Sequence, residues 1–160
     1  MIVMKVSGIV LDPQSRTPIL VLRDMDDRRA LLIWIGPPEA NSIMLVLENI
    51  KLSRPATHDL MTNMLKSLKA ELKSILIHDM KDSTFFAQLV LNNNGKEITV
   101  DSRPSDAVAL ALSSDVPIYV SEQVMASSSI PIDQSKDEEE AAKFKNFIDS
   151  IKPSDFFKGS

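Results

Sequence analysis

Residues 72–100 read LKSILIHDMKDSTFFAQLVLNNNGKEITV, and apolar side chains recur there at every second position. Between Phe85 and Leu91 the apolar residues lie on one face of an extended chain, and residues 92–95 have the composition of a turn. The stretch therefore predicts a three-stranded antiparallel meander. Such a run of strands favours an α+β fold over one in which strands and helices strictly alternate.

The same period of two appears nearer the N-terminus. Ile2, Met4 and Val6 alternate with polar residues, which is typical of a strand and unlike the continuous apolar centre of a signal peptide. Residues 19–22 and 31–35 are two further apolar runs, joined by a charged segment. We therefore expect a second group of strands before any helix.

Three segments show helical spacing instead. Residues 40–50 follow two prolines that are tolerated in a first turn, residues 58–70 follow Thr57 as an N-cap, and a shorter segment opens at Pro104. Residues 107–112 are apolar all round, so this third helix must be covered on nearly every side. For the second helix we expect an apolar stripe that faces the core and consists of Leu60, Met61, Met64, Leu65 and Leu68.

The C-terminal part predicts one more strand and one more helix. Residues 117–120 have strand composition and residues 127–129 that of a loop, while Ser135 and Glu138 form a capping-box pair. The helix that follows carries Phe144, Phe147, Ile148 and Ile151 on one stripe. We expect a compact domain over residues 1–133, with a mixed, largely antiparallel sheet and about four helices in all. The amphipathic helix and tail over 134–160 should pack on this domain or on a second subunit.

Composition excludes several classes of protein. The 160 residues include no Cys and only four widely spaced glycines, which excludes zinc fingers, disulfide scaffolds, P-loops and dinucleotide-binding fingerprints. The net charge is −4, so any contact with a polyanion must be local. The longest apolar runs have six residues, far short of the roughly 20 that span a bilayer. We therefore expect no membrane partner and a cytoplasmic location.

Two predicted helix starts carry similar polar residues. Arg54 and Pro55 precede Thr57, His58 and Asp59, and Arg103 and Pro104 precede Ser105 and Asp106. An arginine, a hydroxyl and free backbone N–H groups at the positive end of a helix suit a phosphate or a carboxylate. The alternative is structural: the hydroxyls cap the helices, and the aspartates complement the helix dipole.

Asp101 lies one turn upstream of Asp106, and two carboxylates together with substrate phosphates can hold Mg²⁺ or Mn²⁺. With no Cys and only two histidines, the sequence lacks the ligands of a typical zinc site, and we expect no organic cofactor. His58 is the better candidate for a general base, because His78 lies in a predicted strand. Glu39 heads its own helix, where a carboxylate complements the dipole.

These residues also lie in stretches that resemble the bifunctional nuclease domain family, in its compact bacterial form. The resemblance covers about residues 1–125 and implies the fold of that family, together with cleavage of RNA and DNA, an activity associated mainly with its plant members. The matching stretches, in family order, are residues 33–36 (IWIG), 54–60 (RPATHDL), 85–87 (FFA), 101–107 (DSRPSDA) and 117–120 (PIYV).

Three functional hypotheses follow. The first is a metal-dependent nuclease in which Asp101 and Asp106 hold the cation, Arg54 and Arg103 bind the phosphate of RNA or DNA with the hydroxyls of Thr57 and Ser105, and His58 or Asp59 activates water. The second is a non-catalytic module that binds an anionic ligand or an acidic partner at the two helix starts. The third is that these residues only stabilise the fold and a subunit interface. A homo-oligomer is expected, with a dimer favoured.

Overall fold

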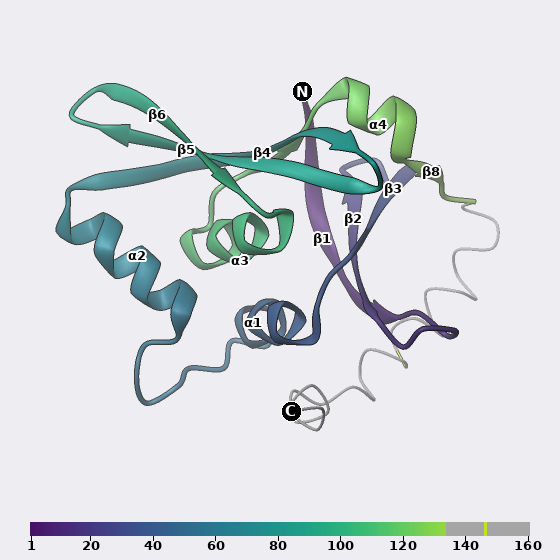
Figure 1. Cartoon of the computed structure of the whole chain (residues 1–160), viewed down its shortest axis with the longest axis horizontal. Helices are drawn as coiled ribbons and strands as arrows, with labels where there is room; N and C mark the ends of the chain where they lie inside the picture. The colour runs from purple at the N-terminus through teal and green to yellow at the C-terminus, as the bar shows by residue number, and fades with distance from the viewer. Residues whose placement is uncertain (134–145, 147–160) are drawn as a thin grey trace.

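The computed structural model describes residues 1–133 and 146 (Figure 1). Eight strands form one sheet in the order β6-β5-β4-β7-β1-β2-β3-β8, and every neighbouring pair is antiparallel except β4 and β7. This confirms the predicted α+β class. The strands are β1 (Ile2–Leu11), β2 (Pro18–Asp24), β3 (Arg29–Trp34), β4 (Ala70–Lys81), β5 (Thr84–Asn93), β6 (Lys96–Ser102), β7 (Ile118–Val120) and β8 (Ile130–Pro131).

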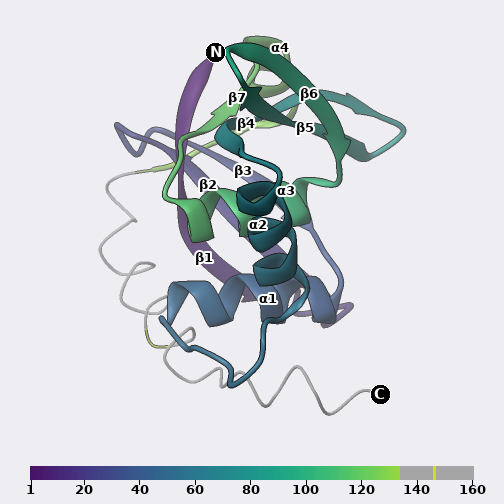
Figure 2. The same cartoon turned by 90° about the vertical axis from the view of Figure 1, so that its left-hand side faces the viewer.

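The sheet consists of two meanders, β1-β2-β3 and β4-β5-β6, joined where β7 lies between β1 and β4. Each meander leads directly into a helix whose first residue is proline: α1 (Pro37–Leu47) follows β3, and α3 (Pro104–Ser114) follows β6. The strands of the two meanders cross at a steep angle, and α1 and α3 lie side by side within it (Figures 1 and 2). The chain thus repeats a unit of three strands and a helix.

The core lies between the sheet and these two helices. Leu20, Leu31, Ile75 and Ile77 are fully buried on the strands. On α3 every residue from Ala107 to Ala111 is buried, as the apolar sequence predicts. Three of these five residues are alanines, whose small side chains let α3 approach both α1 and the strands closely.

The remaining helix, α2 (Thr57–Ser67), does not behave as its sequence predicts, because it has no buried residue. Leu60, Met64 and Leu68 are 54%, 55% and 69% exposed, so the expectation of an inward-facing stripe is wrong. The helix lies at one end of the molecule, beside α3 and the start of β4 (Figure 1). Only Leu65 of the predicted stripe packs against the core.

A short helix, α4 (Glu122–Ser128), occupies the place where a loop was expected at residues 127–129. The hydroxyl of Ser121 caps it by accepting a hydrogen bond from the Val124 N–H at 3.2 Å, and Val124 and Met125 are buried. The predicted C-terminal amphipathic helix lies outside the described residues. No helix in residues 1–133 and 146 is long and apolar enough to cross a membrane.

Candidate functional site at the helix N-termini

The N-terminal ends of α1 and α3 meet through one arginine. Arg103 is the N-cap residue of α3, and its Nε donates a hydrogen bond to Asp106 Oδ2 at 2.8 Å. Its Nη1 donates to Glu39 Oε1 at 2.9 Å, across to α1. Glu39 and Asp106 occupy the same place in their helices, two residues after the initial proline. The guanidinium therefore joins equivalent carboxylates of the two repeated units.

The same aspartate also contacts α2. His58 Nε2 lies 2.9 Å from Asp106 Oδ1, although 48 residues separate the two in the chain. Their side chains are 12% and 21% exposed, so water screens this contact only partly. Both carboxylate oxygens of Asp106 are thus hydrogen-bonded, one to Arg103 and one to His58.

The environment keeps Asp106 ionised. Burial raises the pKa of its carboxyl, but the hydrogen bonds from Arg103 and His58 outweigh burial and hold the pKa below its ordinary 3.8. The hydrogen bonds to Asp106 and Glu39 in turn raise the pKa of Arg103. An ionised Asp106 can only accept hydrogen bonds, so His58 carries its proton on Nε2 and leaves Nδ1 as an acceptor when the ring is neutral.

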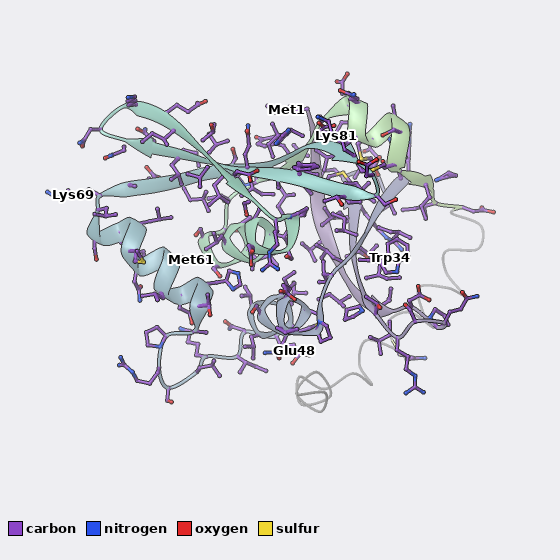
Figure 3. All side chains as sticks on the ribbon, viewed as in Figure 1. Met1, Trp34, Glu48, Met61, Lys69 and Lys81 are labelled. Atoms are coloured by element: carbon purple, nitrogen blue, oxygen red, sulfur yellow. The ribbon has the colours of Figure 1, made fainter. Side chains whose placement is uncertain are left out.

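Arg103 and Glu39 also line a cleft of about 410 Å³. Its lining combines the charged side chains of Glu39 and Arg103 with Trp34, Phe85 and the buried Ser105. Trp34, labelled in Figure 3, is 53% exposed, and its indole Nε1 donates to Asp12 Oδ2 at 3.0 Å. The cleft therefore offers an anchored aromatic ring beside a cation.

Gly36 contributes to this wall by having no side chain. It is the N-cap residue of α1, and a Cβ atom built there would collide with the carboxylate of Glu39. Its φ of −77° is open to any residue, so a side chain at this position would be opposed by the Glu39 carboxylate and not by the backbone. The carboxylate of Glu39 thus folds back over the start of its own helix towards Arg103.

The structure brings together some of the predicted site residues and separates others. His58, Arg103 and Asp106 form one cluster, and Ser105 lines the cleft, although it makes no capping hydrogen bond. Arg54 instead lines a separate depression of about 370 Å³ on the loop before α2.

Of the predicted roles of Thr57 and Asp59 at the start of α2, the structure confirms only that of Asp59. Thr57 is the first residue of the helix, so its predicted role as N-cap is wrong; Ala56 holds that position. Asp59 accepts the Ala56 backbone N–H at 2.9 Å. The structural role expected for Asp59 at the start of the helix is therefore present.

Glu39 is the site residue that sequence reasoning assigned only to the helix dipole. A signal for it was available: residues 36–40 (GPPEA) and 103–107 (RPSDA) place proline, acid and alanine at the same offsets. Equivalent helix starts that follow equivalent meanders come together when the two units pack.

A cation site at Asp101 and Asp106 remains a prediction. Asp101 is exposed on β6, in register with Gln88, and both oxygens of Asp106 already have donors. Within residues 1–133 and 146, no three His, Cys, Asp or Glu side chains are grouped so that they could hold a metal ion. A cation at Asp106 would share its carboxylate with these two donors.

Comparison with known proteins matches residues 20–133 to the bifunctional nuclease domain. An uncharacterized protein of Mycobacterium tuberculosis is 41% identical in an alignment that covers 95% of this chain and 96% of that protein. Bifunctional nuclease 1 of Oryza sativa subsp. indica is 29% identical over 76% of this chain and 41% of its own length. Bifunctional nuclease 1 of Arabidopsis thaliana is 28% identical over 74% of this chain and 38% of its own length. The chain thus spans about two-fifths of these plant proteins.

Proposed function

Because the chain belongs to the bifunctional nuclease domain family, we propose that it hydrolyses phosphodiester bonds of RNA or DNA in the cleft beside Arg103. The observation that carries the proposal is the position of this guanidinium. It is held by hydrogen bonds to Asp106 and Glu39, yet its side chain is 64% exposed and lines the cleft.

Arg103 suits a phosphate because only part of its hydrogen-bonding capacity is used. Two of the five N–H bonds of a guanidinium go to Asp106 and Glu39, which leaves an outer edge for phosphate oxygens. A donor that is already oriented stabilises the charge that develops on a phosphoryl group without further reorganisation. The exposed ring of Trp34 can stack with a base next to that phosphate.

The other residues of the cluster divide between the cleft and its support. Glu39 lines the cleft, and its Oε1 accepts from Arg103, so we assign Glu39 as the carboxylate placed to accept a proton from an attacking water. His58 does not line this cleft, and its contact is with Asp106. His58 and Asp106 therefore position Arg103. The role of general base for His58 or Asp59 is the competing assignment.

A cleavage assay with single substitutions tests the proposal. Full-length protein is incubated with end-labelled single-stranded RNA and DNA, and initial rates are compared. We expect Arg103→Ala and Glu39→Gln to lower cleavage by about 10² to 10³, the range for loss of one preorganised electrostatic group. Arg28→Ala is the matched control, because Arg28 is an exposed arginine at the distant β2–β3 turn and should leave the rate unchanged. Equal rates for Arg103→Ala and Arg28→Ala would reject this site.

The same cleavage assay also tests the predicted cation site. If Asp101 and Asp106 hold Mg²⁺ or Mn²⁺ with the substrate phosphate, chelator should abolish cleavage, and the double substitution Asp101→Asn and Asp106→Asn should raise the cation concentration needed for half-maximal rate. If cleavage requires a cation but this requirement is unchanged in the double variant, the cation binds elsewhere.

One observation favours the non-catalytic alternative. Two carboxylates offset the single positive charge of Arg103, and the whole chain carries a net charge of −4, which suits a short anion better than a polyanion. Trp34 is the only tryptophan, so its fluorescence reports directly on the cleft. A fluorescence change with inorganic phosphate or small phosphate esters, in clean protein that cleaves neither RNA nor DNA, would replace the nuclease proposal by an anion-binding module.

A further inference from the structure

Strand β2 is buried on both of its faces. Leu20 and Leu22 belong to the main core, which β2 shares with α1 and α3. Ile19 and Val21 project from the opposite, outer face of the sheet, yet they are only 7% and 5% exposed. Ala30 of β3 lies on the same outer face and is 4% exposed. A strand whose alternate residues are buried on both sides belongs to a sheet that is covered on both faces.

Among the described residues, the apolar cover of this outer face comes from the sheet and its last strand. Three partly buried apolar side chains pack against Ile19, Val21 and Ala30: Val10, Leu32 and Ile132. Val10 and Leu32 are register partners of Ile19 and Val21 on the neighbouring strands, and none of the six residues belongs to a helix. Side chains of a strand stand perpendicular to the sheet, so such neighbours cover their flanks and not their tips. The outer face therefore needs a further layer.

The outer face also has one position without a side chain. Gly8 lies in register with Val21, next to the β-bulge of β1, and it is buried. Its φ of 148° favours glycine, so no side chain stands opposite Val21 there. A glycine within a sheet leaves room for a large apolar group, such as an aromatic ring, to lie over the backbone.

We propose that this outer face of β1-β2-β3 is the docking surface for residues 134–160 of the same chain. The apolar stripe predicted there supplies two phenyl rings and two isoleucine side chains: Phe144, Phe147, Ile148 and Ile151. A ring suits the position over Gly8, and the aliphatic side chains suit Ile19 and Val21. The surface does not depend on the proposed nuclease function.

The path of the chain selects this segment as the occupant. Ile132 already packs against the outer cluster, and its backbone N–H donates to the Arg28 carbonyl at 2.8 Å, so residues 134–160 start beside this face. Strand β8 lies two strand spacings from β2, roughly 10 Å. Residues 134–143, which precede Phe144, reach about 15 Å even as a helix. The stripe therefore reaches Val21 without a second copy of the chain.

Docking on this face brings the segment close to Trp34. Ile19 lies in register with Trp34, and register partners on adjacent strands project from the same face of a sheet. Trp34 is the only tryptophan and also lines the cleft beside Arg103. The fluorescence of Trp34 therefore reports on the docked segment.

Cysteine crosslinking in the full chain tests the proposal. The chain has no cysteine, so Leu32→Cys with Phe147→Cys places one thiol on the outer face and one on the stripe. We expect a short bismaleimide to join these two thiols within one chain, at the single-chain mass of 17.8 kDa, as identified by peptide mass spectrometry. Leu60→Cys with Phe147→Cys is the matched control, because Leu60 is exposed on α2, at the other end of the molecule (Figure 1), and should give no such link.

Two outcomes of the crosslinking would overturn the proposal. One is a link between Leu32→Cys and Phe147→Cys that forms no faster than the control link. The other is a link that joins two chains at twice the single-chain mass, which would assign the segment to the outer face of a second copy.

Substitution within the stripe provides a second readout. In the full chain, Phe147→Ser with Ile151→Ser removes two apolar side chains from the stripe, and Phe157→Ser is the control because Phe157 lies outside it. We expect the double substitution to lower the unfolding midpoint by at least about 5 °C and to change Trp34 fluorescence, because the outer cluster loses its cover. The control should change neither. A wild-type midpoint and wild-type fluorescence in the double variant would show that the stripe does not cover the outer face.

Discussion

Helices α2 and α3 have the same length and similar leading residues, yet one is exposed and the other is buried. Each spans eleven residues, and each is preceded by an Arg-Pro pair or begins within it. In α3 the arginine is the N-cap residue and Asp106 follows three residues later, within reach of its guanidinium. In α2 Arg54 lies two residues before the N-cap, and Asp59 caps the backbone instead. The same residue types thus build an ion cluster at one spacing and a simple helix start at another.

The difference in burial has a separate cause, which is the place of each helix in the fold. Helix α3 follows a meander directly and lies between α1 and the strands. Helix α2 is the connection between the two repeated units and reaches the domain through one side only. The repeated unit therefore creates the core and the cleft, whereas the connection leaves apolar side chains such as Leu60 and Met64 exposed.

A leucine-to-alanine substitution should have the largest difference in effect between α3 and α2. Leu110→Ala removes a side chain that is 2% exposed and leaves a cavity, so the free energy of unfolding should fall by about 2 to 5 kcal/mol. Leu60→Ala, on the exposed side of α2, should cost less than about 1 kcal/mol. Urea denaturation of both variants, at one protein concentration, measures the two losses. Losses of similar size would mean that Leu60 is as well covered as Leu110.

The next largest effect should come from Asp106, and it should depend on pH. Asp106→Asn removes charge-assisted hydrogen bonds, so it should lower the free energy of unfolding at pH 7 by about 2 kcal/mol. Because folding lowers the pKa of this carboxyl below 3.8, its contribution is complete above that value and disappears as the pH falls through the folded-state pKa. Asp59→Asn should cost only about 0.5 to 1 kcal/mol, because Asp59 accepts a single backbone N–H at an exposed helix start.

Thermal unfolding of both aspartate variants between pH 2 and pH 7 measures these differences. The gap between wild type and Asp106→Asn should narrow only at the acid end of this range. A gap that stays constant down to pH 2 would contradict the assigned role of the Asp106 carboxylate.

These contrasts show how far the sequence could predict the molecule. Period-two and helical spacing identified the strands of both meanders and the starts of α1 and α3, because local chain geometry sets those periods. The exposure of Leu60, Met64 and Leu68 was mispredicted, since periodicity shows which side chains are apolar but not what covers them. Helix α4 was missed because seven residues are too few for a clear period.

The candidate site also combines a local contact that the sequence could predict with long-range contacts that it could not. The contact between Arg103 and Asp106 is local, three residues apart, and its residues were singled out from the sequence. The contacts of the cluster with His58 and Glu39 span 48 and 64 residues and arise only when helices from different units pack together. Sequence spacing has no information about such distances in space.

Gly36→Ala should slow cleavage while leaving the stability of the protein nearly unchanged. The new methyl group pushes the Glu39 carboxylate away from its place over the α1 start and weakens its contact with Arg103. The loss of a partly exposed ion pair, about 0.2 to 1 kcal/mol, is offset by the lower entropy of the unfolded chain, about 0.4 to 1 kcal/mol. We expect an unfolding midpoint close to that of wild type, together with altered Trp34 fluorescence and slower cleavage. Wild-type cleavage would show that Glu39 does not act in the cleft.

The smallest effect should come from Thr57→Ala, which tests the assignment of the α2 start. Thr57 is the first residue of the helix and makes no capping hydrogen bond, so its replacement should change the free energy of unfolding by less than about 0.5 kcal/mol. Ser121→Ala is the comparison, because Ser121 does cap α4 and also donates to the His78 carbonyl at 3.2 Å. Its loss should cost about 1 kcal/mol. If Thr57→Ala proved as costly as Ser121→Ala in urea denaturation, the helix would begin with Thr57 as its cap, and Asp59 would lose the role that separates α2 from α3.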